Sequence, residues 1–161
     1  MEYFDDIEII RALTQEAFQN VLFSNQTEAQ IIDALRDRNA LSLSLVAVEN
    51  DVIIGHVCFS PVYINDVFDH WYGLGPISVH SDFRRQGVGS ALIRQGLEML
   101  NKENARGCVV LGDPQYYRRF GFSCFSNLKY EGAPAEYFLC LAFDGVLPKG
   151  VVKYDIAFDQ D

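Results

Sequence analysis

The residues between Ile77 and Leu92 have the types and order of a phosphate-binding segment. An apolar, strand-like run leads into a basic loop with two glycines, and an amphipathic helix follows; the loop reads Arg84-Arg85-Gln86-Gly87-Val88-Gly89. A helix N-terminus offers unpaired N–H groups and a partial positive charge. Glycine lets the backbone approach a phosphate closely, and arginine adds charge-assisted hydrogen bonds. We therefore predict a pyrophosphate site at this loop.

The glycine spacing narrows the choice of ligand. The sequence has no G-x-x-x-x-G-K-[S/T] segment, which excludes a P-loop, and Leu92 stands where a dinucleotide fingerprint needs its third glycine. The spacing is instead R-x-x-G-x-G. A motif this short also arises by chance, so the alternative is a basic strand-to-helix loop whose glycines serve only the turn.

A second segment, from Val109 to Phe122, combines an apolar strand with a short aromatic helix. Asp113-Pro114 is typical of a helix start, with Asp as the N-cap and Pro in the first turn. Tyr116-Tyr117-Arg118-Arg119-Phe120-Gly121-Phe122 follows, and we expect Gly121 to end the helix in a left-handed conformation.

The two segments together resemble the two signatures of the GNAT acyltransferases in order and spacing. R-x-x-G-x-G resembles the coenzyme A loop of this family, Leu74 to His80 resembles the strand before it, and Tyr116 to Phe122 resembles the second signature. The resemblance spans about residues 5 to 125. Three short motifs are similar to those of the YhbS-type branch of N-acetyltransferases, which has no assigned acceptor: Leu-Gly-Pro, Val-Leu-Gly-Asp-Pro and Tyr-Tyr-x-x-Phe-Gly-Phe.

The resemblance implies acetyl-CoA (coenzyme A), or another short acyl-CoA, as the cofactor. Backbone groups of Ile77, Ser78 and Val79 would pair with the pantetheine arm. The pyrophosphate would lie against the loop and the start of the helix, at Arg84, Arg85, Gln86, Gly87, Val88, Gly89 and Ser90. An amine would attack the thioester directly in a ternary complex, with a strand amide such as that of Val79 polarising the carbonyl. Cys108 lies in an apolar run with no evident base, so we expect no covalent acyl-enzyme.

By the same resemblance, Tyr117 is the candidate general acid that protonates the leaving thiolate. The alternative is a packing aromatic whose hydroxyl is hydrogen-bonded. Tyr116 is interpreted as structural, and Arg118 and Arg119 would either touch coenzyme A phosphates or form a solvated helix face.

The base that deprotonates the amine is less well specified by the sequence. Glu136 and His80 are the first candidates and His56 is the next. For each of them the alternative is a structural or surface role. Asp66 and Asp69, near Trp71-Tyr72, could line an acceptor cleft or form a polar loop. The three histidines, His56, His70 and His80, show no ligand spacing, and we expect no metal.

Two other functions remain open beside an N-acetyltransferase. One is a non-catalytic acyl-CoA sensor or partner-binding module that keeps the fold and the cofactor pocket. The other keeps the chemistry but takes the acyl group from an acyl-carrier protein.

The elements that must position these residues follow from periodicity and turn signals. Helices are predicted over 5–18, 27–38 (with a capping box of Thr27 and Gln30) and 89–101, and strands over 44–49, 52–64, 74–79, 108–111, 137–143 and 150–158. Gly55 and Pro61 indicate irregularities or an edge in the second strand, and Gly96 a close approach of its helix to the sheet. This order predicts an α/β (α+β) fold with a mixed, mostly antiparallel sheet flanked by helices.

One departure from the family pattern concerns the N-terminus. GNAT chains usually begin with a strand, and here only Met1 to Phe4 precedes the first helix, so that strand is short or missing. The sheet edge would then be exposed or covered by another subunit, which leaves monomer and homodimer both open.

Length and composition set the remaining expectations. The 161 residues suit a single domain over 1–161, and the net charge of −9 disfavours nucleic acid. The four cysteines form no C-x-x-C pair, no signal peptide opens the sequence, and no apolar run reaches the ~20 residues of a membrane helix. We therefore expect no membrane association and a cytoplasmic location.

Overall fold

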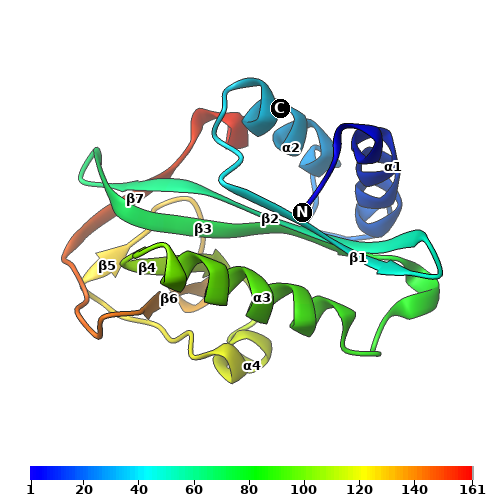
Figure 1. Cartoon of the computed structure of the whole chain (residues 1–161). Coiled ribbons are helices and arrows are strands. Elements are labelled where there is room, and N and C mark those ends of the chain that lie inside the picture. The colour runs from blue at the N-terminus through cyan, green and yellow to red at the C-terminus, as the bar shows by residue number, and fades with distance from the viewer. Residues whose placement is uncertain (161) are drawn as a thin grey trace.

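The computed structural model describes residues 1–160, in which four helices and several short 3-10 turns flank a seven-stranded sheet (Figure 1). The helices are α1 (Ile7–Phe18), α2 (Glu28–Asp37), α3 (Val88–Lys102) and α4 (Pro114–Tyr117). The strands are β1 (Leu43–Glu49), β2 (Val52–Ile64), β3 (Val67–Val79), β4 (Gly107–Leu111), β5 (Leu128–Lys129), β6 (Phe138–Ala142) and β7 (Gly150–Tyr154).

The sheet is mixed and mostly antiparallel, as predicted. Its strand order is β5-β7-β2-β3-β4-β6, with β1 also paired to β2. Only the β3–β4 and β5–β7 pairs are parallel. Pro61 lies in β2 between the segment that pairs with β1, which ends at Phe59, and the segment that pairs with β7, which begins at Val62. Proline has no backbone N–H, and at this position neither β1 nor β7 requires one.

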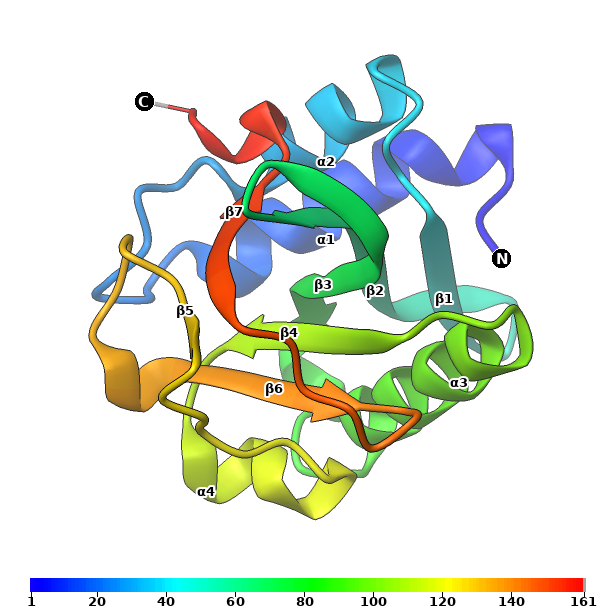
Figure 2. The same cartoon turned by 90° about the vertical axis from the view of Figure 1, so that its left-hand side faces the viewer.

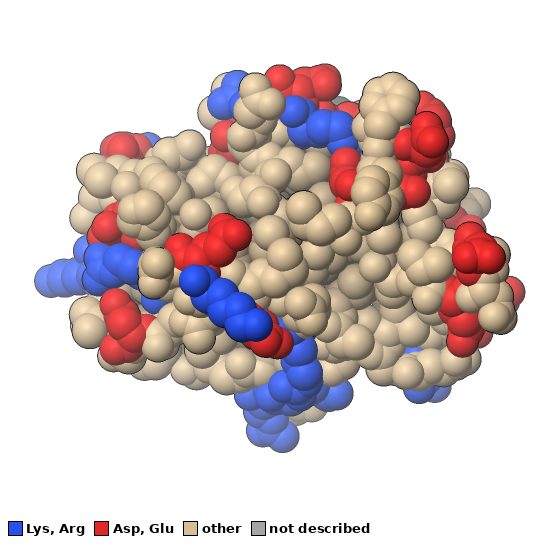
Figure 3. Space-filling view, viewed as in Figure 1, with Lys and Arg blue, Asp and Glu red and all other residues tan. Residues whose placement is uncertain are grey.

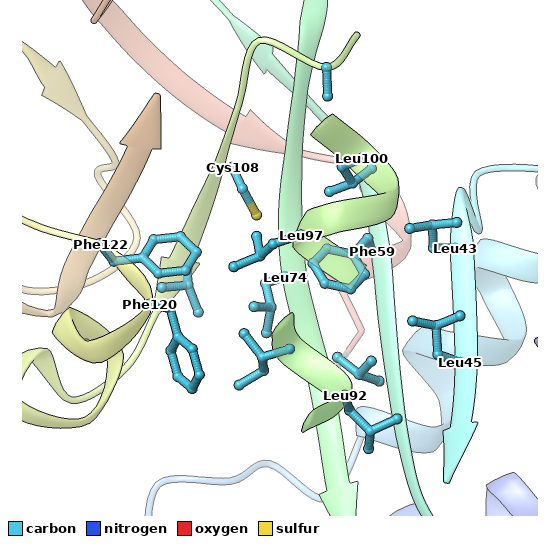
Figure 4. Close-up of a cluster of buried hydrophobic side chains, with 14 of the residues drawn as sticks. Leu43, Leu45, Phe59, Leu74, Leu92, Leu97, Leu100, Cys108, Phe120 and Phe122 are labelled. Atoms are coloured by element: carbon cyan, nitrogen blue, oxygen red, sulfur yellow. The ribbon is translucent and has the colours of Figure 1, made fainter. Parts of the chain in front are cut away.

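Helices cover both faces of the sheet, with α1 and α2 on one side and α3 and α4 on the other (Figures 1 and 2). The apolar stripe of α3 packs on β2 and β3, where Leu92 and Leu97 lie near Phe59 and Leu74 (Figure 4). The expected close approach at Gly96 is confirmed, because a Cβ added there would lie 2.2 Å from the ring of Phe59. The contact fixes α3, and with it the loop that precedes it, against the sheet.

The strands β3 and β4 separate part of the way along their length. Their parallel pairing covers only Trp71 to Gly73 against Gly107 to Val109. Beyond Gly73, β3 continues to Val79 without a partner on that side, while β4 keeps its pairing to β6. Gly75 and Pro76 form a bulge opposite Cys58, where the register of β2 and β3 shifts. The result is an opening in the sheet between the second half of β3 and the end of β4.

The N-terminal strand usual in the family pattern is absent from residues 1–160. Its place at the edge of β1 is marked by one backbone hydrogen bond, from Glu2 N to Ser44 O at 2.9 Å. The Glu2 carboxylate accepts two hydrogen bonds from Arg36 of α2, at 2.9 and 3.0 Å. The ion pair between Glu2 and Arg36 therefore ties the N-terminal segment to α2, at the edge of β1 where the family pattern has a strand.

Several predicted elements need correction. The strand expected over 74–79 begins at Val67, because its first half forms a long hairpin with β2. The strand expected over 150–158 ends at Tyr154, since Asp155 accepts from Ala157 N and starts a 3-10 turn. Thr27 forms no capping box: its side chain is buried and makes no cap hydrogen bond. The sequence analysis missed the two-residue strand β5.

Candidate functional site

The loop between β3 and α3 surrounds a hollow of about 330 Å³, here called the loop hollow. Gly87 is the N-cap of α3 with φ +82°, and Arg85 also takes a left-handed conformation with φ +63°. These turns aim the N-terminus of α3 at the hollow. Most of the expected cofactor residues line it: Val79, Arg84, Arg85, Gly87, Val88, Gly89 and Ser90.

Residues of the second motif close the loop hollow from the opposite side. The Tyr116 hydroxyl lies 3.5 Å from the position that a Cβ on Gly89 would take. The Arg119 guanidinium lies 4.5 Å from the centroid of the Tyr116 ring, and its Nε donates to Tyr116 O at 2.8 Å. Three arginines thus border the loop hollow and no acidic residue lines it. In Figure 3, a group of basic side chains lies at the lower edge of the molecule, near α4. The arrangement suits a polyanion.

The second half of β3 pairs with β2 but not with β4, and it turns backbone groups toward the opening in the sheet. His80 N donates to Ile54 O at 2.8 Å, so the Ile54–His80 pair is hydrogen-bonded. Hydrogen-bonded and non-hydrogen-bonded pairs alternate along antiparallel strands. The pairs of Val79 with Gly55 and of Ile77 with Val57 are therefore not bonded, and the Val79 and Ile77 amides face away from β2. They are free to bind an extended ligand in the opening.

A larger pocket of about 580 Å³, here called the splay pocket, occupies this opening. Leu74 to Ile77 of β3 and Val110 and Leu111 of β4 form its sides. Tyr117 lines it from the α4 face of the sheet, and Phe18 and Glu28 line it from the α1–α2 face. The two hollows share the same strand edge, since Ile77 lines the splay pocket and Val79 lines the loop hollow.

Tyr117 is fixed by packing, and its hydroxyl has no protein hydrogen bond. Its ring lies on Gly112, where an added Cβ would be 2.4 Å from Tyr117 Cε2. Burial, with smaller effects of Tyr116 and Cys108, raises the pKa of Tyr117 to about 12. No residue in 1–160 accepts from or donates to its phenol oxygen. The hydrogen-bonded packing role considered for this hydroxyl is therefore not observed, and the phenol is protonated at neutral pH.

Two of the expected cofactor residues do not reach either hollow. The Ser78 side chain is 2% exposed, and its hydroxyl is buried without a partner among the described residues. The Gln86 side chain donates to Asp82 O at 3.3 Å. By the alternation described above, the Ser78–His56 pair is hydrogen-bonded, so the Ser78 backbone also faces β2 and not the opening.

The structure does not bring the candidate bases to Tyr117. Glu136 is exposed on a 3-10 turn, and neither it nor His80 lines the splay pocket. His80 Nδ1 accepts from Asp82 N at 3.1 Å. His56 is fully buried, and its Nε2 lies 2.7 Å from Ser44 Oγ. Burial is the main reason that its pKa falls to about 4.

Of the two interpretations given for Asp66 and Asp69, the structure favours the polar loop over an acceptor cleft. Trp71 is completely buried in the core. Asp66 pairs with Lys153 at 2.9 Å, and Asp69 pairs with Arg106. Neither carboxylate lines the splay pocket.

Several residues of the splay pocket were not predicted from the sequence, among them Tyr130, Tyr154 and Glu28. Tyr130, Tyr154 and Glu28 come from β5–β6, β7 and the start of α2, which only the fold brings together. Tyr116 was interpreted as structural, and the structure places it in the wall of the loop hollow. The sequence signal for Tyr116 was present, because it precedes Tyr117 in the same motif.

Residues 1–160 contain no group of three or more side chains that could hold a metal ion. Within the same range, none of the helices has the length and apolar character needed to span a bilayer. Cys58, Cys108, Cys124 and Cys140 are free, and burial raises the pKa of the Cys108 thiol. A buried thiol of raised pKa is a poor nucleophile.

Comparison with known proteins gives consistent results. A family model described as "Acetyltransferase (GNAT) family" matches residues 7–122. The chain is 39% identical over 145 residues to the uncharacterized N-acetyltransferase YhbS of Escherichia coli K12, covering 86% of this chain and 87% of that protein. A GNAT family acetyltransferase from Brucella melitensis, solved with acetyl-CoA, superposes with a TM-score of 0.89 at 48% identity, covering 98% and 95% of the two chains. YhbS of E. coli, solved with CoA, superposes with a TM-score of 0.88 at 31% identity, covering 99% and 89%.

Proposed function

The chain is an acyltransferase of the GNAT family, and from that premise we propose that it transfers an acetyl group from acetyl-CoA to an amine in a ternary complex. The observation that carries this proposal is the position of the two hollows along the same free edge of β3. One suits a pyrophosphate, and the other holds a partly buried, protonated phenol beside strand amides that have no partner on that side. The relatives solved with acetyl-CoA and CoA support the same cofactor here.

In this proposal the pyrophosphate lies in the loop hollow. The N-terminal amides of α3 and the side chains of Arg84, Arg85 and Arg119 surround that hollow. Amides at a helix N-terminus and arginines are both strong partners for phosphate oxygens. Tyr116 closes the hollow from the far side. The pantetheine arm then runs along Ile77 and Val79, whose amides face the opening, and brings the thioester to Tyr117.

The chemistry would be direct attack of the amine nitrogen on the thioester carbonyl. The C–N bond forms, the carbonyl oxygen gains negative charge, and a free strand amide such as that of Val79 stabilises this charge. The nitrogen then loses a proton to solvent, the C–S bond breaks and the thiolate leaves. A phenol whose pKa is about 12 is a weak acid but an always-available hydrogen-bond donor. Tyr117 would therefore stabilise the thiolate mainly by hydrogen bonding as its charge develops.

The test is thermal unfolding with and without acetyl-CoA. Ligand at ~100 times its Kd should stabilise the chain by about 2.7 kcal/mol, a rise of roughly 5 to 10 °C. Gly87→Glu should abolish the rise, because it places a carboxylate where a phosphate would bind. Gly145→Glu is the matched control: Gly145 also has a positive φ, of +74°, and open space, but lies in a distant turn. A wild type without any rise would overturn the proposed cofactor.

The alternatives make different predictions in the same samples. A sensor module would bind acetyl-CoA, and Tyr117→Phe would leave its background thioester cleavage unchanged. An enzyme that uses an acyl-carrier protein would prefer a carrier-linked thioester over acetyl-CoA. No feature of the loop hollow favours a carrier over the nucleotide end of coenzyme A.

A further inference from the structure

The part of the splay pocket beyond Tyr117 is walled mainly by aromatic rings. Phe18 and Phe23 approach from α1 and the loop that follows it, and Tyr130, Tyr154 and Phe158 from the C-terminal half of the chain. Phe23 is 95% exposed and stands at the rim. The rings come from three separate parts of the sequence, so only the folded chain assembles this wall.

Three of the rings form a packed array. The rings of Tyr130 and Tyr154 meet edge to face, with centroids 5.1 Å apart, and Phe158 lies 5.0 Å from Tyr154 on the other side. Tyr154 also occupies the space above Gly73, where an added Cβ would lie 2.6 Å from its ring. Gly73 is the last residue of β3 that pairs with β4. The array is therefore anchored where the two strands separate, at the base of the pocket.

Among residues 1–160, Glu28 is the one charged side chain that lines the splay pocket. It is the first residue of α2 and is partly buried, and its carboxylate accepts a hydrogen bond from Ser24 Oγ. No arginine, lysine or histidine of residues 1–160 lines the pocket. A ligand there meets one negative charge, phenol hydroxyls and apolar surface.

This lining selects among amines by charge. An α-amino acid would place its carboxylate in a pocket with no cation to pair it, and a buried unpaired charge is costly. A polyamine would bring several positive charges to a single carboxylate. A monoamine would place its ammonium group at Glu28 and its carbon skeleton on the rings, where apolar burial and cation–π attraction both favour it.

We propose that the acceptor is a primary monoamine with an aromatic or branched apolar body, held by its ammonium group at Glu28 and by its body on the Tyr130–Tyr154–Phe158 array. This assignment rests on the proposed acetyl transfer. Before attack, the ammonium gives one proton to the Glu28 carboxylate and on to solvent. The free amine forms the C–N bond and its nitrogen then loses a second proton, the C–S bond breaks, and the thiolate takes up one proton.

A matched pair of acceptors tests the charge argument. 2-Phenylethylamine and L-phenylalanine differ only in a carboxylate, and 3-methylbutylamine and spermidine extend the comparison to a branched monoamine and a polyamine. With acetyl-CoA, kcat/KM for each monoamine should exceed that for L-phenylalanine and spermidine by at least about 10-fold, the effect of ~1.4 kcal/mol. Equal or better use of either comparison compound would overturn the proposal.

Variants at Glu28 test the residue assignment. Glu28→Gln should raise KM for 2-phenylethylamine about 10-fold or more and leave KM for acetyl-CoA unchanged. Glu49→Gln, at the exposed end of β1, is the matched control and should change neither. Equal KM values in the Glu28 variant and the wild type would contradict the role of Glu28.

Failure of this inference is distinguishable from failure of the proposed function. A chain that shows the acetyl-CoA thermal shift but acetylates neither monoamine refutes the acceptor class alone. A chain without that shift refutes the cofactor, on which the acceptor class depends.

Discussion

The ring of Tyr117 stands perpendicular to that of Tyr116, with the two centroids 5.0 Å apart, and each ring lines a different hollow. The two residues are neighbours on the four-residue helix α4, which begins at the Asp113 N-cap and is followed by the turn that ends at Gly121. This short helix therefore contributes one tyrosine to the wall around the expected pyrophosphate and one to the opening where the thioester would lie. The two hydroxyls should then serve different steps.

Loss of the Tyr117 hydroxyl should slow the reaction without weakening cofactor binding. Tyr117→Phe removes the donor to the leaving thiolate and keeps the packing on Gly112. We expect kcat to fall about 10²-fold, the usual effect of removing one donor to developing charge, with an unchanged Kd for acetyl-CoA. Steady-state kinetics and a binding titration measure the two quantities.

Tyr116→Phe is the matched control for this variant. Its hydroxyl lies by Gly89 in the loop hollow, so its removal should weaken acetyl-CoA binding and leave kcat nearly unchanged. The wild-type pH profile gives a second check. Because the pKa of Tyr117 is raised to about 12, the phenol keeps its proton and should cause no alkaline loss of kcat below about pH 11. A normal kcat in Tyr117→Phe would rule out the acid role.

A methyl group added at position 112 should also lower kcat, because it would displace the ring of Tyr117. In Gly112→Ala the new Cβ would lie 2.4 Å from Tyr117 Cε2, so the ring must move. Displacing a catalytic group by about 1 Å can cost ~10²-fold in rate. We expect kcat to fall by at least 10-fold, with acetyl-CoA still bound. Urea unfolding should show a loss of about 1–3 kcal/mol, typical of overpacking. Combining Gly112→Ala with Tyr117→Phe should add little further loss of kcat, and full additivity would contradict this coupling.

Local sequence patterns were enough to predict the loop hollow. Arg84 to Gly89 are adjacent along the chain, and the strand before them and the helix after them have clear periodicity. The residues that form the hollow on this side therefore belong to one continuous strand–loop–helix segment. The same holds for Asp113, Pro114 and Gly121, whose caps the structure confirms. The roles of these residues toward a cofactor stay predictions.

The splay pocket could not be predicted in this way, because its residues are distant in sequence. Tyr154 reaches Gly73 only after β7 pairs with β2, and Glu28 reaches the opening only through the packing of α2. Asp66 and Asp69 are the opposite case, for which the sequence left both a cleft and a polar loop open. Their nearness to Trp71 along the chain suggested a cleft, but a long hairpin places them at its tip, paired with Lys153 and Arg106.

Buried His56 should make the chain less stable as the pH falls from 6.5 to 4. Its pKa is lowered from 6.5 to about 4, mainly by burial; Glu2 opposes this effect and Arg36 adds to it. Between these two pH values the unfolded chain binds a proton that the folded chain does not, so the free energy of unfolding rises with pH. A pKa of about 4 in place of 6.5 corresponds to roughly 3 kcal/mol of stability. Urea unfolding at a series of pH values measures this slope.

The contribution of His56 can be separated from that of its neighbour Glu2. Burial opposes ionisation of Glu2, but hydrogen bonds from Arg36 and Ser44 outweigh it, so its pKa is lowered from 4.5. A carboxyl group with a lowered pKa loses its stabilising effect only below about 4.5, which leaves the range from 5 to 6.5 to His56. In His56→Gln the slope over this range should nearly vanish, although the chain is less stable overall. His70→Gln, at an exposed position of the hairpin, should keep the wild-type slope. An unchanged slope in His56→Gln would mean that another group carries the acid sensitivity.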